Sequence, residues 1–304
     1  MSSPREIPLR DLHFRLPEAC GFSTVWFDLP GVRLHAAVAG PESGQPVILL
    51  HGFPEFWYSW IKQIGPLAEA GFRVIAPDQR GYNLSSKPKG ISAYRIDILA
   101  QDIINLMDSL GYAKARVVGH DWGGAVAWAV AALHPERVER LAILDSPYPP
   151  VVIPGMLAHP RQILKSYYVL LFQLPGIAES MLHRDHWKTL IKNMKSTTPA
   201  GTFTPEDFDY YRETWEQEHA ITSMLSWYRA LVQRPVRLPA NPHLKMPVRV
   251  IWGGQDFALG RPLAEASIKM CENGELVMFE GANHWIQREE AEKVNQKLLE
   301  FFSA

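Results

Sequence analysis

The sequence predicts an α/β fold, with a mostly parallel central sheet and helices on both of its faces. Short apolar runs recur along the chain, each about the length of a buried strand and most of them followed by turn residues. In the first half of the chain they alternate with segments in which apolar residues have helical spacing. The expected parallel strands are residues 46–50, 72–76, 116–118, 141–144, 248–252 and 276–279.

The same patterns predict the elements around these strands. Residues 23–39 alternate around a Pro-Gly pair, as expected of a β-hairpin that precedes the first buried strand. The expected helices of the sheet region are residues 94–110, about 124–134 and 287–302.

The alternation of strands and helices stops near Pro147. Residues 150–242 contain aromatic-rich helical segments and several prolines, and they show no convincing strand pattern. We therefore expect residues 1–147 and 243–304 to form one α/β core, and residues 148–242 to form a helical lid inserted into it.

Composition excludes several classes of protein. The chain has 304 residues, enough for one large domain with a substantial core. Its formal net charge is -1 without long runs of one sign, so neither a nucleic acid nor an anionic membrane is expected as a partner. Two cysteines, Cys20 and Cys271, are too few for a disulfide framework. Metal-ligating and phosphate-binding motifs are missing, and we expect no cofactor.

The sequence also predicts where the protein is found. Its first 15 residues lack the apolar core of a signal peptide. No apolar run approaches the roughly 18 residues of a membrane-spanning helix, so we expect no membrane insertion and a cytoplasmic location. The choice between monomer and homodimer stays open.

The candidate nucleophile is Asp121, which lies between an expected strand and an expected helix. Gly119 and Gly123 flank it with the Gly-x-nucleophile-x-Gly spacing of a nucleophile elbow, where serine is usual. A carboxylate is already ionised at neutral pH, and its attack on an sp3 carbon forms an ester that water can cleave. Asp121 therefore indicates an epoxide or a haloalkane as the substrate. The alternative role for Asp121 is to cap the following helix, and His120 is expected to be structural.

A base and an acid follow later in the chain. His284 comes just after the last expected strand, and Asp256 follows the strand at 248–252. The order nucleophile, acid, histidine is that of the α/β-hydrolase fold, which we therefore expect here. Asp256 would orient the imidazole of His284 and stabilise its protonated form.

Two backbone N–H groups are expected to stabilise the oxyanion of ester hydrolysis. One belongs to Trp122, the residue after the nucleophile, and the other to Phe53 in the loop after the strand at 46–50. Pro54 follows Phe53 through a bond whose isomer the sequence does not determine. His51 is expected to support this turn.

The sequence resembles the epoxide hydrolases of the α/β-hydrolase fold. Residues 51–60, His-Gly-Phe-Pro-Glu-Phe-Trp-Tyr-Ser-Trp, are similar to that family's oxyanion-loop signature, and residues 119–124 are similar to its nucleophile motif. Asp256 and His284 match its remaining triad positions. The resemblance covers about residues 25–302 and implies conversion of epoxides to vicinal diols through an ester on the nucleophile. Asn83 departs from the family, in which many members have Gly.

The resemblance also implies two lid tyrosines that donate hydrogen bonds to the epoxide oxygen. Residues 166–173 are similar to the first tyrosine segment and indicate Tyr168, with Tyr167 as its rival. Residues 224–229 are similar to the second and indicate Tyr228. The alternative is that these tyrosines only pack inside the lid. The expected lining of the substrate pocket is Phe53, Pro54, Trp122 and Phe172.

Other families remain as alternatives. Haloalkane dehalogenases share an Asp nucleophile, and the Trp122 indole could bind a halide. They generally place Asn where this chain has Phe53, or use a lid Trp, and Phe53 has no side-chain donor. Fluoroacetate dehalogenases carry an Arg at the position of Trp122. An ordinary esterase and a non-catalytic binder of the same fold are further alternatives. The paired tyrosines favour an epoxide as the substrate.

Overall fold

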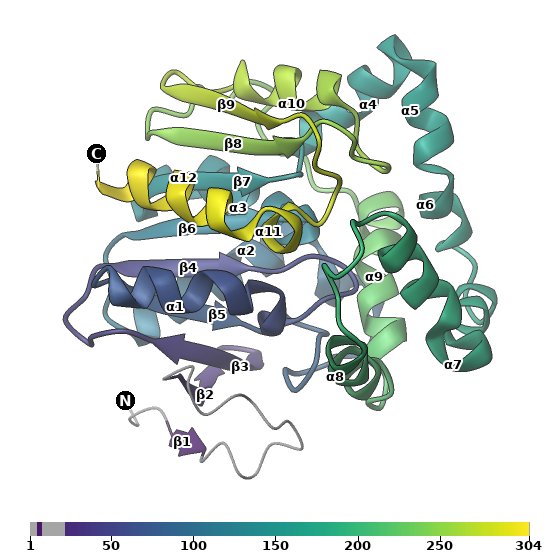
Figure 1. The fold of residues 1–304 in the computed structure, drawn as a ribbon, viewed down its shortest axis with the longest axis horizontal. Coiled ribbons are helices and arrows are strands. Elements are labelled where there is room, and N and C mark those ends of the chain that lie inside the picture. The colour runs from purple at the N-terminus through teal and green to yellow at the C-terminus, as the bar shows by residue number, and fades with distance from the viewer. Residues whose placement is uncertain (1–4, 8–21, 304) are drawn as a thin grey trace.

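The structure is a computed structural model that describes residues 5–7 and 22–303. Within these residues one nine-stranded sheet has the order β1-β2-β3-β5-β4-β6-β7-β8-β9 (Figure 1). Strands β5, β4, β6, β7, β8 and β9 are parallel to one another, and β1 to β3 form an antiparallel edge. The strands are β1 (Arg5–Ile7), β2 (Ser23–Leu29), β3 (Val32–Ala39), β4 (Pro46–Leu50), β5 (Arg73–Pro77), β6 (Ala115–His120), β7 (Val138–Leu144), β8 (Val248–Gly253) and β9 (Gly274–Phe279). The expected fold class is confirmed.

Helices cover both faces of the sheet. In Figure 1, α1 and α12 lie in front of it, and α2 and α3 lie behind it. Buried apolar residues of β4, β6 and β7 fill the space between these layers. The helices of this part are α1 (Ile61–Glu69), α2 (Ile96–Ser109), α3 (Asp121–Leu133), α10 (Arg261–Ile268), α11 (Ile286–Glu289) and α12 (Ala291–Ser303).

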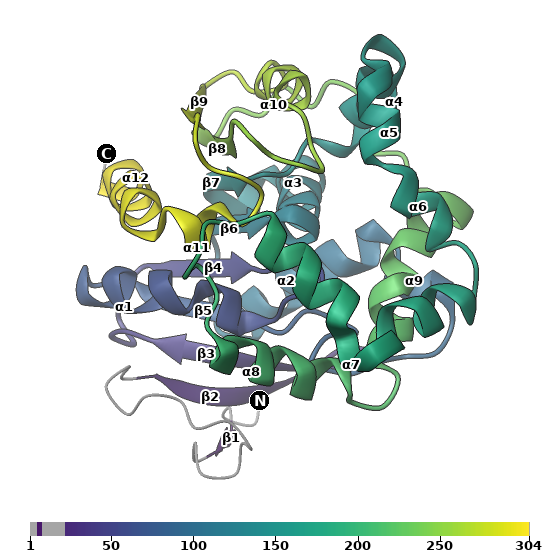
Figure 2. The same cartoon turned by 45° about the vertical axis from the view of Figure 1, so that its right-hand side comes forward.

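Between β7 and β8 the chain forms six helices and no strand of the sheet. They lie beyond the carboxyl ends of the parallel strands in both ribbon views (Figures 1 and 2). The six are α4 (Pro149–Ala158), α5 (Pro160–Lys165), α6 (Tyr167–Leu171), α7 (Ile177–Ser196), α8 (Pro205–Trp215) and α9 (Ala220–Gln233). We refer to them as the lid helices; the division of the chain at residues 147 and 243 remains a prediction.

Several elements differ from the sequence prediction. Helix α1 was not expected, because Gly65 and Pro66 interrupt its helical pattern. The C-terminal helix is broken at Glu290, where the backbone leaves helical geometry. Helix α7 is kinked, and three consecutive residues from Asp185 have positive φ.

The structure describes one of the two cysteines, and it bears on the membrane prediction. Cys20 lies outside the described residues, as does most of the N-terminal segment, and Cys271 has a partly buried free thiol. Among the described helices, none is both long enough and apolar enough to cross a membrane.

Candidate active site

The turn after β6 presents Asp121 at the carboxyl edge of the sheet. Its φ is 49°, a left-handed conformation that a residue other than glycine adopts at an energetic cost. The neighbouring glycines make the turn possible. A Cβ atom on Gly119 would lie 2.3 Å from the Gly123 carbonyl oxygen, and one on Gly123 would lie 2.1 Å from the Leu50 carbonyl oxygen. Side chains at either position would force the turn to move.

Parallel pairing of β4 with β6 brings the oxyanion loop to this turn. Leu50 lies opposite Gly119, so the chain leaves both strands side by side. The backbone N–H of Phe53 donates a 2.9 Å hydrogen bond to Oδ1 of Asp121. From the other side, the Ser146 hydroxyl donates to the Asp121 carbonyl at 2.7 Å. One carboxylate oxygen of Asp121 is thus bound and the other is left for chemistry.

His284 and Asp256 meet Asp121 at the same edge. Nδ1 of His284 lies 2.8 Å from Oδ2 of Asp256, and Nε2 lies 3.6 Å from Oδ2 of Asp121. The second oxygen of Asp256 accepts the backbone N–H groups of Ala258 and Leu259 at 2.7 and 2.8 Å. Asp256 can therefore fix the tautomer and the ring orientation of His284.

Further hydrogen bonds connect the loop that carries Asp256 with the loop that carries His284. The Asn283 side-chain oxygen accepts the backbone N–H groups of Phe257 and His284. The Glu289 carboxylate accepts the backbone N–H groups of Asn283 and Trp285. The short helix α11 therefore fixes the loop that carries His284. His120 is buried behind the site and contacts the His284 carbonyl at 2.8 Å, in keeping with its expected structural role.

Charge in the site favours an ion pair between Asp121 and His284. Burial alone would raise the pKa of Asp121, but the nearby imidazole of His284, the charge of His120 and the Phe53 N–H together bring it below its usual value. Burial would lower the pKa of His284, but Asp256 and Asp121 together raise it well above its usual value. Asp121 is therefore ionised in the resting enzyme.

Two tyrosines of the lid helices face this carboxylate. Tyr228 of α9 is buried, Tyr168 of α6 is half-buried, and their ring centres lie 6.0 Å apart. Burial and then the charge of Asp121 raise the pKa of both phenols above the usual value. Both phenols thus remain protonated donors. Tyr167, the rival of Tyr168, is 68% exposed.

The residues expected to line a substrate pocket form an aromatic cluster around Tyr228. The ring centre of Tyr228 lies 5.3 Å from Phe53 and 4.9 Å from both Trp122 and Phe172. The neighbouring Trp122 side chain opposes the rise in the pKa of Tyr228. Pro54 is buried after a cis peptide bond, and its carbonyl accepts the indole N–H of Trp215. Phe53, Trp122 and Phe172 thus share one apolar surface with both tyrosines.

The sequence prediction missed a second carboxyl group beside the triad, Asp145. It follows β7 at the same sheet edge, is fully buried, and accepts the Gly253 N–H at 2.8 Å. Within the described part of the chain, its other oxygen has no hydrogen-bond partner. Burial and then the charge of Asp256 raise its pKa well above the usual value, so this environment favours the protonated group. Its position directly after a buried strand, like that of Asp256, was the available signal.

The sequence prediction also missed a latch between the lid helices and the acid loop. The Gln162 side chain on α5 accepts the Gly260 N–H at 2.9 Å and donates to the Ala258 carbonyl at 2.7 Å. Lys165, one turn later, donates to the Asp256 carbonyl at 2.5 Å. Tyr168 lies three residues beyond Lys165. These hydrogen bonds therefore fix the position of the first tyrosine relative to Asp256.

Comparisons with known proteins show the family of this chain. A family model described as the alpha/beta hydrolase fold matches residues 45–291. Human epoxide hydrolase 4 is 35% identical, over 89% of this chain and 76% of its own length. The chain belongs to the epoxide hydrolases of the α/β-hydrolase fold. This epoxide hydrolase is also 48% identical to the AB hydrolase superfamily protein YfhM of Bacillus subtilis, over 89% of this chain and 94% of that protein. A crystal structure of the Bacillus megaterium epoxide hydrolase with an inhibitor is similar at 30% identity and a TM-score of 0.84, over 92% of this chain and 100% of that one.

Proposed function

We propose that this epoxide hydrolase converts epoxides to vicinal diols through a covalent ester on Asp121. The observation that carries the proposal is an ionised carboxylate in the elbow, bound through one oxygen and faced by two protonated tyrosines. Such a carboxylate attacks carbon without a base, and phenols can donate to the oxygen that leaves that carbon.

In the ring-opening step, Oδ2 of Asp121 attacks one epoxide carbon from the side opposite the C–O bond that breaks. We assign the attack to Oδ2 because Oδ1 is already held by the Phe53 N–H. Tyr168 and Tyr228 hydrogen-bond the epoxide oxygen, and one of them transfers a proton to it as the ring opens. The product is a hydroxyalkyl ester of Asp121.

In the hydrolysis step, His284 removes a proton from a water that attacks the ester carbonyl carbon. The N–H groups of Phe53 and Trp122 stabilise the oxyanion, and Asp256 stabilises the imidazolium. The bond from the carbonyl carbon to the alkoxy oxygen breaks, so the diol takes an oxygen from Asp121. The second proton of the water passes to that alkoxy oxygen, which leaves Asp121 as a carboxylate, and the proton held by His284 restores the tyrosine. The water oxygen stays on Asp121.

The alternative function is haloalkane dehalogenation by the same nucleophile. It would need the Trp122 indole as a halide donor, but the Trp122 ring packs edge-on against Tyr228, with the ring centres 4.9 Å apart. An alkyl halide also gives the two phenols no basic oxygen to protonate. The proposal includes the helical lid at residues 148–242 and the cytoplasmic location expected from the sequence.

Turnover of styrene oxide and 1-bromobutane, with diol and bromide assayed in parallel, tests this function. We expect diol without bromide, and no diol from Asp121→Ala. Bromide without diol would replace the proposal with the dehalogenase function. If wild-type protein forms neither product, while a wider epoxide panel also gives no diol, the proposal is wrong.

A further inference from the structure

The outer side of the lid helices is unusually apolar for a protein surface. Among the described residues, eight of the eleven exposed large hydrophobic side chains lie between residues 153 and 177, with exposed fractions from 46% to 75%. We call these eight residues the lid strip: Ile153, Leu157, Ile163, Leu164, Tyr167, Leu170, Leu174 and Ile177. Clusters of this kind mark interaction sites, whereas single exposed apolar residues are normal.

The helices that carry the strip form the outer margin of the molecule. Helices α4, α5 and α6 follow one another along the side away from the sheet in both ribbon views (Figures 1 and 2). Helix α6 contributes residues both to the strip and to the candidate site. It exposes Tyr167 and Leu170, whereas Tyr168 packs against Tyr228.

Basic residues accompany the strip. Residues 149–196 contain six Lys and Arg against two Asp and Glu, a net charge of +4, although the whole chain carries -1. One of the two acidic residues, Glu179, is paired with Arg229 at 2.7 Å. The exposed basic side chains of the segment are Arg161, Arg184, Lys188, Lys192 and Lys195.

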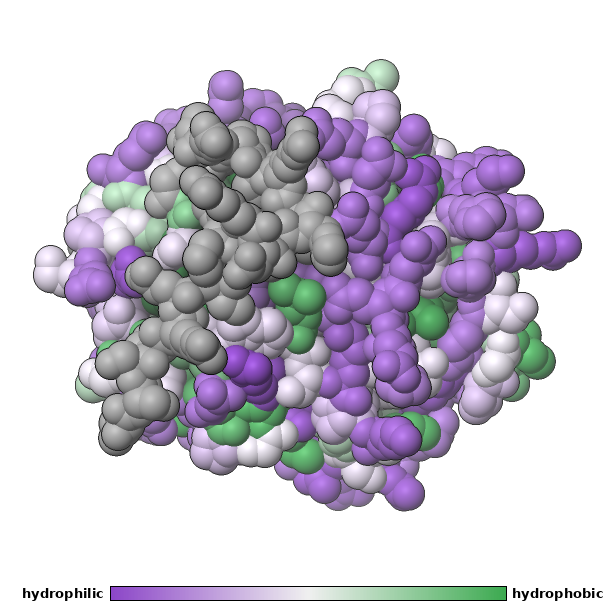
Figure 3. Space-filling model, turned by 90° about the horizontal axis from the view of Figure 1, so that it is seen from below, coloured by the Kyte–Doolittle hydropathy of each residue, from purple (hydrophilic) through white to green (hydrophobic). Residues whose placement is uncertain are grey.

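Apolar and basic residues also meet directly on this surface. Ile177, the last residue of the strip, and Arg184 line the same open hollow on α7. The face seen from below is largely hydrophilic toward the lid side, with apolar surface at its right-hand margin (Figure 3). An apolar face bordered by Lys and Arg is typical of proteins that lie on a membrane surface without crossing it.

We propose that the lid strip docks on an anionic lipid surface. The net charge of the whole chain predicted no anionic membrane partner, because acidic residues elsewhere in the chain offset the positive charge of residues 149–196. A second copy is the other possible cover, but a symmetric pair would bring the same +4 segments together, because a two-fold interface apposes a patch with itself. An anionic leaflet instead attracts each nearby Lys or Arg by about 1 kcal/mol, roughly a fivefold gain in binding per charge.

The docked arrangement gives the strip a role that rests on the proposed function. Apolar epoxides partition into the acyl region of a bilayer. Docking would place the acyl region against the outer side of α6, the helix that carries Tyr168 on its inner side. The surface then supplies lipophilic epoxides to the site, whereas a water-soluble epoxide reaches it without docking.

Co-sedimentation of the full chain with vesicles tests the proposal. The two compositions are phosphatidylcholine alone and phosphatidylcholine with phosphatidylglycerol. We expect binding to the anionic vesicles only, weakening as salt rises. Leu164→Ser with Leu170→Ser removes apolar contact, and Lys188→Gln with Lys192→Gln removes two charges. Each pair should lower the partition coefficient by on the order of tenfold.

Leu133→Ser is the matched control, because Leu133 is an exposed apolar residue at the far end of α3 from Asp121. It should bind vesicles like the wild type. Thermal unfolding checks the folding of every variant, and styrene oxide turnover should be unchanged in all of them.

Two outcomes would overturn the proposal. One is wild-type protein that leaves anionic vesicles unbound, or strip variants that bind them as well as the wild type. The other is a dimer, seen by light scattering, that the Leu164→Ser and Leu170→Ser changes dissociate, which would assign the strip to a second copy. Vesicle binding by a wild type without epoxide turnover would support the surface and reject only the proposed function.

Discussion

Nε2 of His284 lies 3.6 Å from Oδ2 of Asp121, the oxygen that the Phe53 N–H leaves unbound. This distance exceeds that of a direct hydrogen bond. A histidine at this position can accept a proton from a water that lies near the Asp121 carboxyl carbon. The two residues therefore have separable tasks. Asp121 forms the ester without His284, and His284 is needed only to cleave it.

Changing His284→Gln should stop the reaction at the ester. We expect intact mass to rise by one epoxide, with the added mass on the peptide that contains Asp121. The double variant that also carries Asp121→Ala should gain no mass. If a substrate that the wild type turns over leaves no adduct on His284→Gln, the two-step mechanism is wrong.

The two lid tyrosines should matter for ring opening. We expect Tyr168→Phe and Tyr228→Phe each to slow ester formation by on the order of 10²-fold, because the alkoxide loses a donor. The matched control is Tyr167→Phe, which should stay within about twofold of the wild type, since that side chain is 68% exposed. Pre-steady-state kinetics measures both steps. Ester hydrolysis slowed more than ester formation would remove the tyrosines from this role.

Asp256 and Asp145 are two buried carboxyl groups with different expected tasks. Asp256→Asn should lower turnover by about 10²–10⁴-fold, because the amide no longer stabilises the imidazolium or selects its tautomer. Asp145→Asn should retain turnover, because burial favours the protonated, uncharged form of Asp145 and the amide oxygen of the new side chain can still accept the Gly253 N–H. Equal losses in the two variants, both folded by circular dichroism, would show that Asp145 contributes to turnover as much as Asp256 does.

Acidic pH should make the ester accumulate on the wild-type enzyme. In the resting site, Asp256 and Asp121 overcome burial and raise the pKa of His284. Esterification removes the charge of Asp121, so the pKa of His284 falls, but Asp256 still raises it. Hydrolysis then slows as pH falls through that pKa, whereas ester formation continues until Asp121 is protonated, below its usual pKa. Rapid-quench mass spectrometry at several pH values measures the adduct; accumulation at alkaline pH would contradict this assignment.

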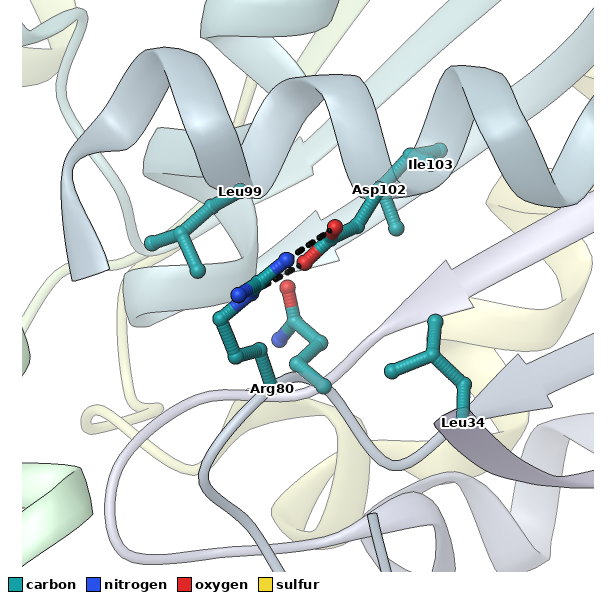
Figure 4. A pocket seen from close by; sticks show the side chains of 6 residues that line it. Leu34, Arg80, Leu99, Asp102 and Ile103 are labelled. Atoms are coloured by element: carbon teal, nitrogen blue, oxygen red, sulfur yellow. Dashed lines mark hydrogen bonds and ion pairs between the residues drawn. The ribbon is translucent and has the colours of Figure 1, made fainter. Parts of the chain in front are cut away.

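A buried ion pair lies in the loop that binds Trp227, the residue before the second lid tyrosine. Arg80 makes two hydrogen bonds to Asp102 of α2, at 2.6 and 2.7 Å (Figure 4), and the Arg80 carbonyl accepts the indole N–H of Trp227. Burial raises the pKa of Asp102, although Arg80 opposes the shift.

Removing the Asp102 carboxylate should leave the buried guanidinium of Arg80 without a charged partner. We expect Asp102→Asn to lower the free energy of unfolding by about 3 kcal/mol. The matched change Asp97→Asn breaks the more exposed pair with Arg95 and should cost at most about 1 kcal/mol. Urea denaturation gives both values. Equal effects would show that burial of the Arg80–Asp102 pair adds nothing to its importance.

Much of the site could be predicted because parallel strands end at one edge of a sheet. The apolar runs before Asp121, Asp256 and His284 located those edges, and the structure brings the three side chains together there. The lid tyrosines could be indicated only by the resemblance, because a helical pattern does not show which aromatic faces inward. Tyr167 and Tyr168 are adjacent in sequence, and their different exposure follows from the packing of α6 on α9.

The remaining features depend on contacts between distant segments. Gln162 meets Ala258 and Gly260 nearly a hundred positions away, and no local pattern encodes such a latch. Asp145 is a single acidic residue without a motif. Its raised pKa follows from its burial and from the charge of Asp256, which only the packed structure brings close to it.

The most direct test of the central claim is a single turnover in water labelled with heavy oxygen, with enzyme in excess over a proven epoxide substrate. The ester mechanism predicts an unlabelled diol, because its new oxygen comes from Asp121, and a labelled peptide that contains Asp121. A diol that carries the label after one turnover, with no label on that peptide, would mean that water attacks the epoxide directly, and would contradict the assignment of Asp121 as the nucleophile.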